Sequence, residues 1–152
     1  MLNKILVSSC LLGQKVRYDG GDCSQNNAIL NQWIDEGRVI SICPEVKGGL
    51  AVPRLPAEIQ DSRVMNSEGC DVTDAFGLGA KIALSLCKQH NIKFALLKAK
   101  SPSCGNSQIY DGTFSKSLVK GQGITASLLK QNNIHVFNEE EIQELDKMIS
   151  SL

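Results

Sequence analysis

Branched apolar residues gather in four short runs along the chain. The runs are KILVSSC (Lys4 to Cys10), RVISIC (Arg38 to Cys43), KFALLKA (Lys93 to Ala99) and IHVF (Ile134 to Phe137). Short runs rich in Ile, Val and Leu are typical of strands. The first three are almost continuously apolar, which favours strands that are covered on both faces, as in a parallel sheet.

Between these runs, apolar residues recur about every 3.6 positions, which predicts helices. Each predicted helix begins at or just after a residue that can serve as an N-cap. The helices are expected from Ser24 to about Gly37, from about Val72 to His90 behind Asp71, from Ile124 through Leu129 after Gly123, and from Asn138 through Ile149. Asn138 and Glu141 together resemble a capping box.

The order of these elements predicts the fold class. Strands that alternate with helices are typical of a doubly wound α/β fold with parallel strands. A chain of 152 residues can bury roughly 70% of the surface that its unfolded form exposes, so it can form its own core. We therefore predict one domain over residues 1–152, with a Rossmann-like, three-layer α/β architecture and a mostly parallel sheet of about four strands.

Two connections are longer than such a domain needs: Pro44 to about Cys70, and Lys100 to Gly123. Loops longer than about 12 to 15 residues in a compact domain usually carry function. Within the second connection, the segment IYDGTF predicts a hairpin with Asp111-Gly112 as a two-residue turn.

Composition narrows the class of protein. The 16 Lys and Arg balance the 16 Asp and Glu, which argues against a nucleic-acid backbone or an anionic membrane as the main partner. The apolar stretch before Cys10 is too short for a secretion signal, and no stretch is long enough to span a membrane. We therefore expect a cytoplasmic protein, in which the six cysteines are reduced and indicate metal binding or thiol chemistry.

Three of the cysteines fall at equivalent places in the predicted sheet. Cys10, Cys43 and Cys104 each lie at or just past the carboxyl end of a strand, and in open α/β sheets this edge binds ligands. Three thiolates without a fourth ligand suit an iron–sulfur cluster better than a closed zinc site, and would leave one iron of a four-iron cluster open. The alternative is that Cys10 and Cys43 are small buried side chains at strand ends.

Residues next to these cysteines favour a functional site. Pro44 turns the chain after Cys43 and presents Glu45, which can donate or accept a proton. Lysines and hydroxyl side chains surround Cys104 in KAKSPSCGNSQ, and nearby cations favour a thiolate. Taken singly, Glu45 would be a solvated carboxylate and Ser101-Pro102 a turn; the combination with three cysteines favours chemistry.

These residues resemble a known family, the iron–sulfur-dependent thiouracil desulfurases (TudS-like desulfidases), long catalogued as a bacterial domain of unknown function. The shared motifs are SSCLLGQKVRYDGG (8–21), CPEVKGGLAVPRLPAEI (43–59), DVTDAFGLGA (71–80), KAKSPSCGNSQIYDGTF (98–114) and the G-x-G-x-T-A-x-L-L segment (121–129). The resemblance covers nearly the whole chain.

The resemblance implies that Cys10, Cys43 and Cys104 hold a [4Fe-4S] cluster in which one iron has no protein ligand. It also implies that Glu45 and Ser101 act in catalysis. In the implied reaction, the sulfur of a thiolated pyrimidine such as 2-thiouracil or a thiouridine nucleotide binds the free iron, and water replaces it at the ring carbon. Glu45 is the candidate for moving a water or ring proton, and Ser101 for positioning the base or relaying a proton.

Other motif residues have two open roles. Arg17 and Arg54 either brace their loops or contact the substrate, and with Ser103 they are the candidate substrate-binding residues. The cysteines without assigned chemistry are Cys23, Cys70 and Cys87, of which the last belongs to the apolar stripe of the long helix.

Two alternative functions remain open from the residues. One is a cluster-free, cysteine-based sulfur-transfer or redox enzyme that uses Cys104, although no C-x-x-C motif supports it. The other is a non-catalytic metal- or ligand-binding module. The expected partner is a small thiolated base or nucleotide rather than RNA, and the oligomeric state and the position of the sulfur on the ring stay open.

Overall fold

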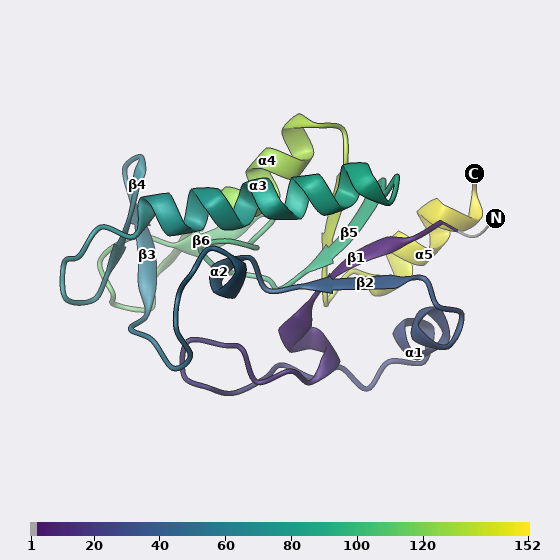
Figure 1. Ribbon diagram of the computed structural model, residues 1–152, viewed down its shortest axis with the longest axis horizontal. Helices are drawn as coiled ribbons and strands as arrows, with labels where there is room; N and C mark the ends of the chain where they lie inside the picture. Colours follow the sequence, from purple (N-terminus) through teal and green to yellow (C-terminus); the bar gives the residue numbers. More distant parts are fainter. Residues whose placement is uncertain (1–2) are drawn as a thin grey trace.

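A four-stranded parallel sheet forms the centre of the molecule. The computed structural model describes residues 3–152, and its sheet has the strand order β2-β1-β5-β8 (Figure 1). The strands are β1 (Ile5–Ser8), β2 (Val39–Ile42), β5 (Phe94–Leu97) and β8 (His135–Asn138). They coincide with the four apolar runs, and the predicted parallel α/β sheet is confirmed.

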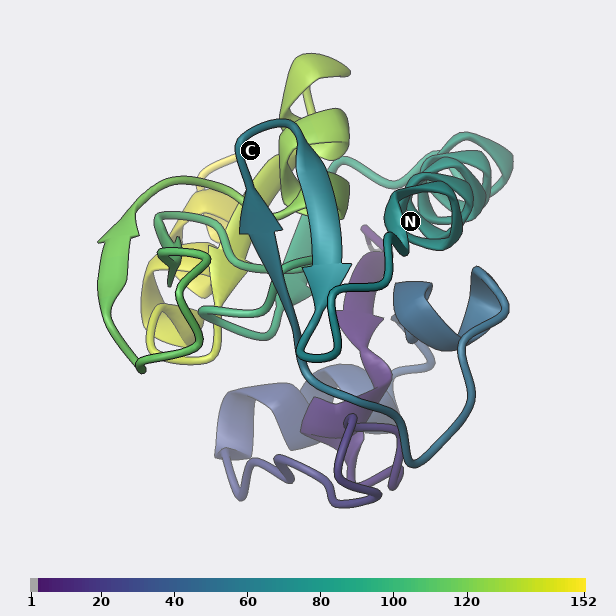
Figure 2. The same cartoon turned by 90° about the vertical axis from the view of Figure 1, so that its left-hand side faces the viewer.

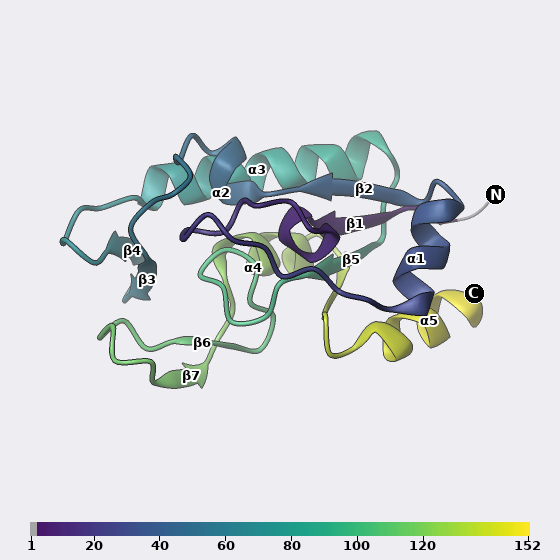
Figure 3. The ribbon, with the colours of Figure 1, turned by 90° about the horizontal axis from the view of Figure 1, so that it is seen from below.

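Helices cover both faces of this sheet and give three layers (Figures 1 and 3). The helices are α1 (Ala28–Asp35) and α5 (Ile142–Ser150) on one face, and α3 (Thr73–Gln89) and α4 (Ile124–Gln131) on the other. Side chains alternate across a strand, so Ile5 and Val7 pack with Trp33 on one face while Leu6 packs with Ala83 on the other. Within residues 3–152, no helix combines the length and the apolar character needed to cross a membrane.

Two helix starts differ from the sequence prediction. Helix α1 begins at Ala28, because the side chain of Asn27 accepts hydrogen bonds from the amides of Ile29 (2.9 Å) and Leu30 (3.2 Å). The prediction of Ser24 as its cap was wrong, since Ser24 lies in the preceding segment and its own amide donates to Asp22.

Helix α5 begins at Ile142, so the prediction that it begins at Asn138 was also wrong. Asn138 is the last residue of β8 and pairs with Leu97. The expected reciprocal contact forms nevertheless: the amide of Asn138 donates to the Glu141 carboxylate at 3.0 Å. This contact closes the turn between β8 and α5 rather than the first turn of the helix.

The first long connection contains regular structure that the sequence did not indicate. After β2 the chain forms a short helix α2 (Pro44–Lys47) and an antiparallel hairpin of β3 (Ala57–Gln60) and β4 (Arg63–Asn66), which stands in front in Figure 2. The strand sequences AEIQ and RVMN carry polar and exposed side chains. Because they contain no apolar run, they lack the pattern that revealed the central strands.

The second long connection contains the expected hairpin with a different turn. Strands β6 (Gln108–Tyr110) and β7 (Leu118–Lys120) are antiparallel, with Tyr110 opposite Leu118. Residues 111–117 join them, so the predicted two-residue Asp111-Gly112 turn was wrong. We call this segment the β6–β7 loop.

Candidate active site

A cavity of about 700 Å³ lies at the carboxyl edge of the sheet, and Cys10, Cys43 and Cys104 are all among its lining residues. Strand β1 lies between β2 and β5. After β1 the chain forms β2 on one side of it and later forms β5 on the other side. Ligands bind at such a point in open α/β sheets. The three cysteines, far apart in sequence, therefore meet around one space.

Cys10 belongs to a turn rather than to the strand that the sequence predicted. Strand β1 ends at Ser8, and Cys10 lies in the short 3-10 helix η1 (Ser9–Leu12) that follows it. Its side chain is 8% exposed. Burial, together with the neighbouring thiols of Cys104, Cys23 and Cys43, raises the pKa of Cys10 to about 12.

Cys43 lies immediately before α2, whose first residue is Pro44. Its thiol points to the carbonyl oxygen of Val16 at 3.9 Å. Burial raises the pKa of the Cys43 thiol, although the backbone amides of Val46 and Glu45 act in the opposite direction by hydrogen bonding. These amides therefore offer donors to a thiolate at this position.

Cys104 is held in a turn by two serine hydroxyls. The Ser101 hydroxyl oxygen accepts hydrogen bonds from the amides of Ser103 and Cys104, both at 3.1 Å. The Ser8 hydroxyl donates to the Cys104 sulfur at 3.5 Å and accepts from the amide of Lys98 at 3.0 Å. Burial is the main cause that raises the pKa of Cys104 to about 12.

This donor set fits an iron–sulfur cluster. Burial raises the pKa of each of the three thiols, so converting them to thiolates requires a bound cation that displaces their protons. Thiolates are the soft ligands that such clusters prefer. Within residues 3–152, no three His, Cys, Asp or Glu side chains meet closely enough to ligate one metal ion. Thiols spaced around one cavity can each ligate a different iron of a multi-iron group.

Glu45 lines the same cavity and pairs with Arg54. The Arg54 Nε lies 3.3 Å from the Glu45 carboxylate, and its other nitrogens donate to the carbonyls of Ala51 (3.1 Å) and Val16 (3.0 Å). Burial raises the pKa of Glu45, and the Arg54 charge partly offsets that effect. Glu45 is thus a half-buried carboxylate that its salt bridge with Arg54 orients, next to Cys43 in the chain.

The other predicted site residues occupy different places. Ser101 and Arg17 line the cavity, and the Arg17 guanidinium also donates to the Cys23 sulfur at 3.2 Å. Ser103 is fully buried, shares a 2.7 Å hydrogen bond with Thr125 and is absent from the described cavity lining. This burial does not support the substrate contact predicted for Ser103.

The sequence reasoning missed several residues of the cavity. Ser8, which was missed, donates a hydrogen bond to the Cys104 sulfur. Lys98, which the sequence already indicated as a cation near Cys104, lines the cavity too, and its ammonium pairs with Glu139 at 2.8 Å. Tyr110 and Phe114 also line the cavity. The signal for all of them was membership in the motifs that contain Cys10 and Cys104, since neither periodicity nor composition sets them apart.

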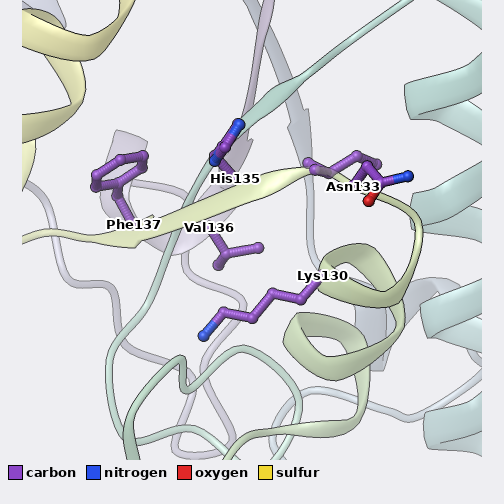
Figure 4. Close-up of a pocket in the computed structure, with 6 residues that line it drawn as sticks. Lys130, Asn133, His135, Val136 and Phe137 are labelled. Atoms are coloured by element: carbon purple, nitrogen blue, oxygen red, sulfur yellow. The ribbon is translucent and has the colours of Figure 1, made fainter.

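A second hollow, of about 440 Å³, lies along β8 (Figure 4). Its lining residues are Lys130, Asn133, Ile134, His135, Val136 and Phe137. None of these lining residues from the described part of the chain is a thiol or a carboxylate. The cysteine thiols and the carboxylates of Glu45 and Glu58 line the larger cavity instead.

Comparisons with known proteins agree with this geometry. The model of the 2-thiouracil desulfurase family matches residues 5–141. A protein of Bacillus subtilis (strain 168), described as uncharacterized protein YbbK, is 38% identical over 151 residues, covering 93% of this chain and 99% of that protein. A solved structure described as the [4Fe-4S]-dependent thiouracil desulfidase TudS (DUF523Vcz) matches with a TM-score of 0.97, at 47% identity and over 99% of both chains. The family match spans most of the chain, which therefore belongs to the 2-thiouracil desulfurase family.

Proposed function

We propose that this protein is a [4Fe-4S]-dependent desulfidase that hydrolyses the thiocarbonyl group of a thiolated pyrimidine. Its membership in the 2-thiouracil desulfurase family and its similarity to the TudS structure support this class of reaction. The observation that carries the proposal is the meeting of three thiols, of which Cys10 and Cys104 are buried and Cys43 is half-buried, with the Glu45 carboxylate around one cavity.

In this proposal Cys10, Cys43 and Cys104 hold the cluster, and one iron has no protein ligand. The Cys23 amide donates to the Cys10 carbonyl, and the Cys23 sulfur accepts a hydrogen bond from Arg17. Cys23 is not part of the described cavity lining. The ligand set is therefore three thiols rather than four. When bound, the cluster supplies a Lewis acid for the exocyclic sulfur of the substrate.

The reaction exchanges one atom. A C=S group and one water give a C=O group and hydrogen sulfide, so both water protons leave with the sulfur. Glu45 accepts a proton from the attacking water and returns a proton to the departing sulfur or a ring nitrogen. Its salt bridge with Arg54 (3.3 Å) keeps the carboxylate facing the cavity while this proton moves.

Ser101 and the two arginines act around this proton transfer. The Ser101 oxygen accepts two amide hydrogen bonds, which leaves its own O–H free to donate to a ring carbonyl or nitrogen. Arg17, on the cavity wall, is the residue for a polar substituent of the substrate. Arg54 donates to Glu45, Ala51 and Val16, so we assign it to positioning Glu45 rather than to binding substrate.

The size of the cavity supports a small substrate. A volume of about 700 Å³ lies within the roughly 300–1,000 Å³ range of small-molecule sites. Because the cluster would occupy part of this volume, the space that is left favours a thiolated base or nucleotide over a larger substrate.

The test is anaerobic reconstitution of the wild-type chain, followed by measurement of bound iron and of sulfide release from thiolated bases, nucleosides and nucleotides. We expect about four irons per chain, as a four-iron cluster requires, and sulfide from at least one thiopyrimidine. Cys43→Ala should lose both, whereas Cys70→Ala, which changes an exposed thiol, should lose neither. Equal sulfide release by iron-free protein would instead support the cluster-free sulfur-transfer alternative.

A further inference from the structure

The β6–β7 loop (residues 111–117) forms part of the cavity wall, and the proposed reaction leaves it without a role. Phe114 and Lys116 from this loop line the cavity, together with Glu45 and the three cysteines. The loop comes from one long connection and its contacts come from the other, the β3–β4 hairpin. Hydrogen bonds made by Glu58 and Gln60 thus join two segments that are distant in sequence.

A buried carboxylate makes this junction. Glu58, on β3, is 8% exposed, and one of its oxygens accepts hydrogen bonds from the amides of Gly112 (2.9 Å) and Phe114 (3.2 Å). The Gln60 side chain donates to the Gly112 carbonyl at 2.7 Å. A Cβ atom on Gly112 would lie only 2.8 Å from the Ile59 carbonyl oxygen, so the loop fits closely against the strand.

This junction holds Phe114 in a backbone conformation that an aromatic residue rarely adopts. Its φ angle is 57°, in the left-handed region, which is unfavourable for residues other than glycine. Such conformations persist where neighbouring contacts enforce them, and they cluster at ligand sites. Here the bond from the Phe114 amide to Glu58 is one of those contacts.

Phe114 is an aromatic residue of this wall, as Tyr110 is. Its ring has no polar group that a hydrogen bond could satisfy, and the residue lines the same cavity as Glu45 and the thiols. Aromatic side chains stack on heteroaromatic rings, and the gain in binding free energy depends on the overlap of the rings and not on the pattern of hydrogen bonds. A flat pyrimidine is the kind of ligand that such a wall accepts.

We propose that Phe114 packs against the pyrimidine ring of the substrate, and that Glu58 is a positioning residue that presents Phe114 to the cavity. This inference rests on the proposed function, because it assigns a recognition residue to the same site. In this proposal the two long connections recognise the ring of the substrate, whereas residues at the edge of the sheet carry out the chemistry.

Phe114→Leu and Phe114→Tyr in the reconstituted enzyme test the recognition step. We expect Phe114→Leu to raise the KM for 2-thiouracil, and the Kd for uracil measured by calorimetry, about tenfold or more, consistent with the cost of removing one stacked ring. Phe114→Tyr, which retains the ring, should stay within about threefold of wild type, because a stacking gain depends on the ring face. An unchanged Kd for uracil in Phe114→Leu would overturn the proposal.

Glu58→Met and Glu58→Gln test the positioning role. Methionine has no oxygen to accept the two amides, so Glu58→Met should weaken uracil binding by a similar factor; glutamine keeps a carbonyl oxygen and should restore most of it. The double variant of Glu58→Met and Phe114→Leu should bind no more weakly than Phe114→Leu alone, because both changes remove the same contact. If the two changes weakened uracil binding additively, Glu58 would not act through Phe114.

Further controls separate the possible failures. If Glu58→Met does not fold, Gln60→Met removes the neighbouring bond to Gly112 and should weaken uracil binding in the same direction. Ser115→Ala, in an exposed part of the loop, should leave the Kd unchanged. If wild-type enzyme releases no sulfide from any thiopyrimidine, the proposed function fails; if it does but Phe114→Leu binds uracil normally, only this inference fails.

Discussion

The cavity has two kinds of wall. The walls that carry Cys43 and Cys104 each pack closely against a helix, and a glycine in or just before that helix makes the close approach possible. We call them the helix-backed walls. The wall that carries Cys10 is formed by η1 and residues 13–27, which we call the first loop. Its described contacts are hydrogen bonds and side-chain packing rather than a close approach to a helix.

The glycine contacts of the helix-backed walls leave no space for a side chain. A Cβ on Gly79 of α3 would lie 1.9 Å from the carbonyl oxygen of Pro44, next to Cys43. A Cβ on Gly123, before α4, would lie 2.5 Å from the Ser103 carbonyl, next to Cys104. In the first loop, by contrast, a Cβ on Gly13 would meet the Ser24 side chain at 3.6 Å or more, an ordinary contact distance.

The difference explains which parts of the site are fixed by packing and which by polar contacts. Cys43 and Cys104 take their positions from the backbones of α2 and the 101–104 turn, which lie directly on helices. The first loop is joined to the first long connection by Arg54, whose amide and side chain donate to the carbonyls of Tyr18 (2.7 Å) and Val16 (3.0 Å). Arg54 therefore links the two kinds of wall.

Gly79→Ala should have the largest effect, because it forces α2 away from α3 and moves Cys43. Overpacking of this kind costs about 1–3 kcal/mol of unfolding free energy, and we expect the variant to retain little iron after reconstitution. Gly77→Ala is the matched control on the same helix, where a Cβ meets nothing within 4 Å; it should be neutral or stabilise by about 1 kcal/mol. Wild-type iron content in Gly79→Ala would break the comparison between the walls.

Glu45→Gln should lower turnover without affecting cluster absorption. General acid–base catalysis contributes about 10²–10⁴-fold, and glutamine cannot carry the proton although it keeps the shape and the contact with Arg54. Sulfide release by the reconstituted variant checks this, with Glu68→Gln, an exposed change, as control. Undiminished turnover would remove Glu45 from the mechanism.

Arg54→Lys tests the link between the walls. Lysine keeps the charge but cannot donate simultaneously to Glu45, Ala51 and Val16, as the guanidinium does. We expect kcat to fall by about 10- to 100-fold, because small displacements of catalytic groups have effects of this size. Iron content should stay near wild type, because Pro44, next to Cys43, still packs against Gly79 of α3. Loss of the cluster would show that polar contacts hold this wall as well.

Asp71→Asn should have the smallest effect and a defined pH dependence. Hydrogen bonds from Thr73 and the Arg63 charge lower the pKa of Asp71 from 3.8 to about 2. A carboxyl group whose pKa is lower in the folded state than in the unfolded chain stabilises the folded state fully at any pH above its unfolded-state pKa. This stabilisation is lost as the pH falls through the pKa of the folded state. Urea unfolding should therefore show a small stability gap between wild type and variant at pH 6 that closes between about pH 4 and 2. If the stability gap did not change with pH, it would come from the altered shape of the side chain and not from the Asp71 charge.

The central sheet and the edge that carries the cysteines followed from the sequence for a physical reason. Strands covered on both faces must be apolar throughout, so KILVSSC, RVISIC and KFALLKA were visible as runs. Parallel strands then placed Cys10, Cys43 and Cys104 at one edge. The motifs around them carried the family resemblance, and the family match confirms it.

The remaining features depend on contacts that spacing does not encode. The segment SQNN before α1 contains several residues able to cap a helix, and only the folded backbone selects Asn27 over Ser24. The β3–β4 hairpin is stabilised through Glu58 and other contacts distant in sequence rather than through an apolar run. Likewise, the sequence shows that Gly79 is small, but not that it lies against Pro44.

The most direct test of the account follows the oxygen atom during turnover. Reconstituted wild-type protein is given 2-thiouracil in ¹⁸O-labelled water under anaerobic conditions, and uracil and sulfide are quantified together. The account predicts equimolar products, one solvent oxygen in each uracil, and no turnover by the Cys43→Ala variant. Sulfide release without solvent oxygen in the uracil, or equal turnover by protein that lacks iron, would contradict it.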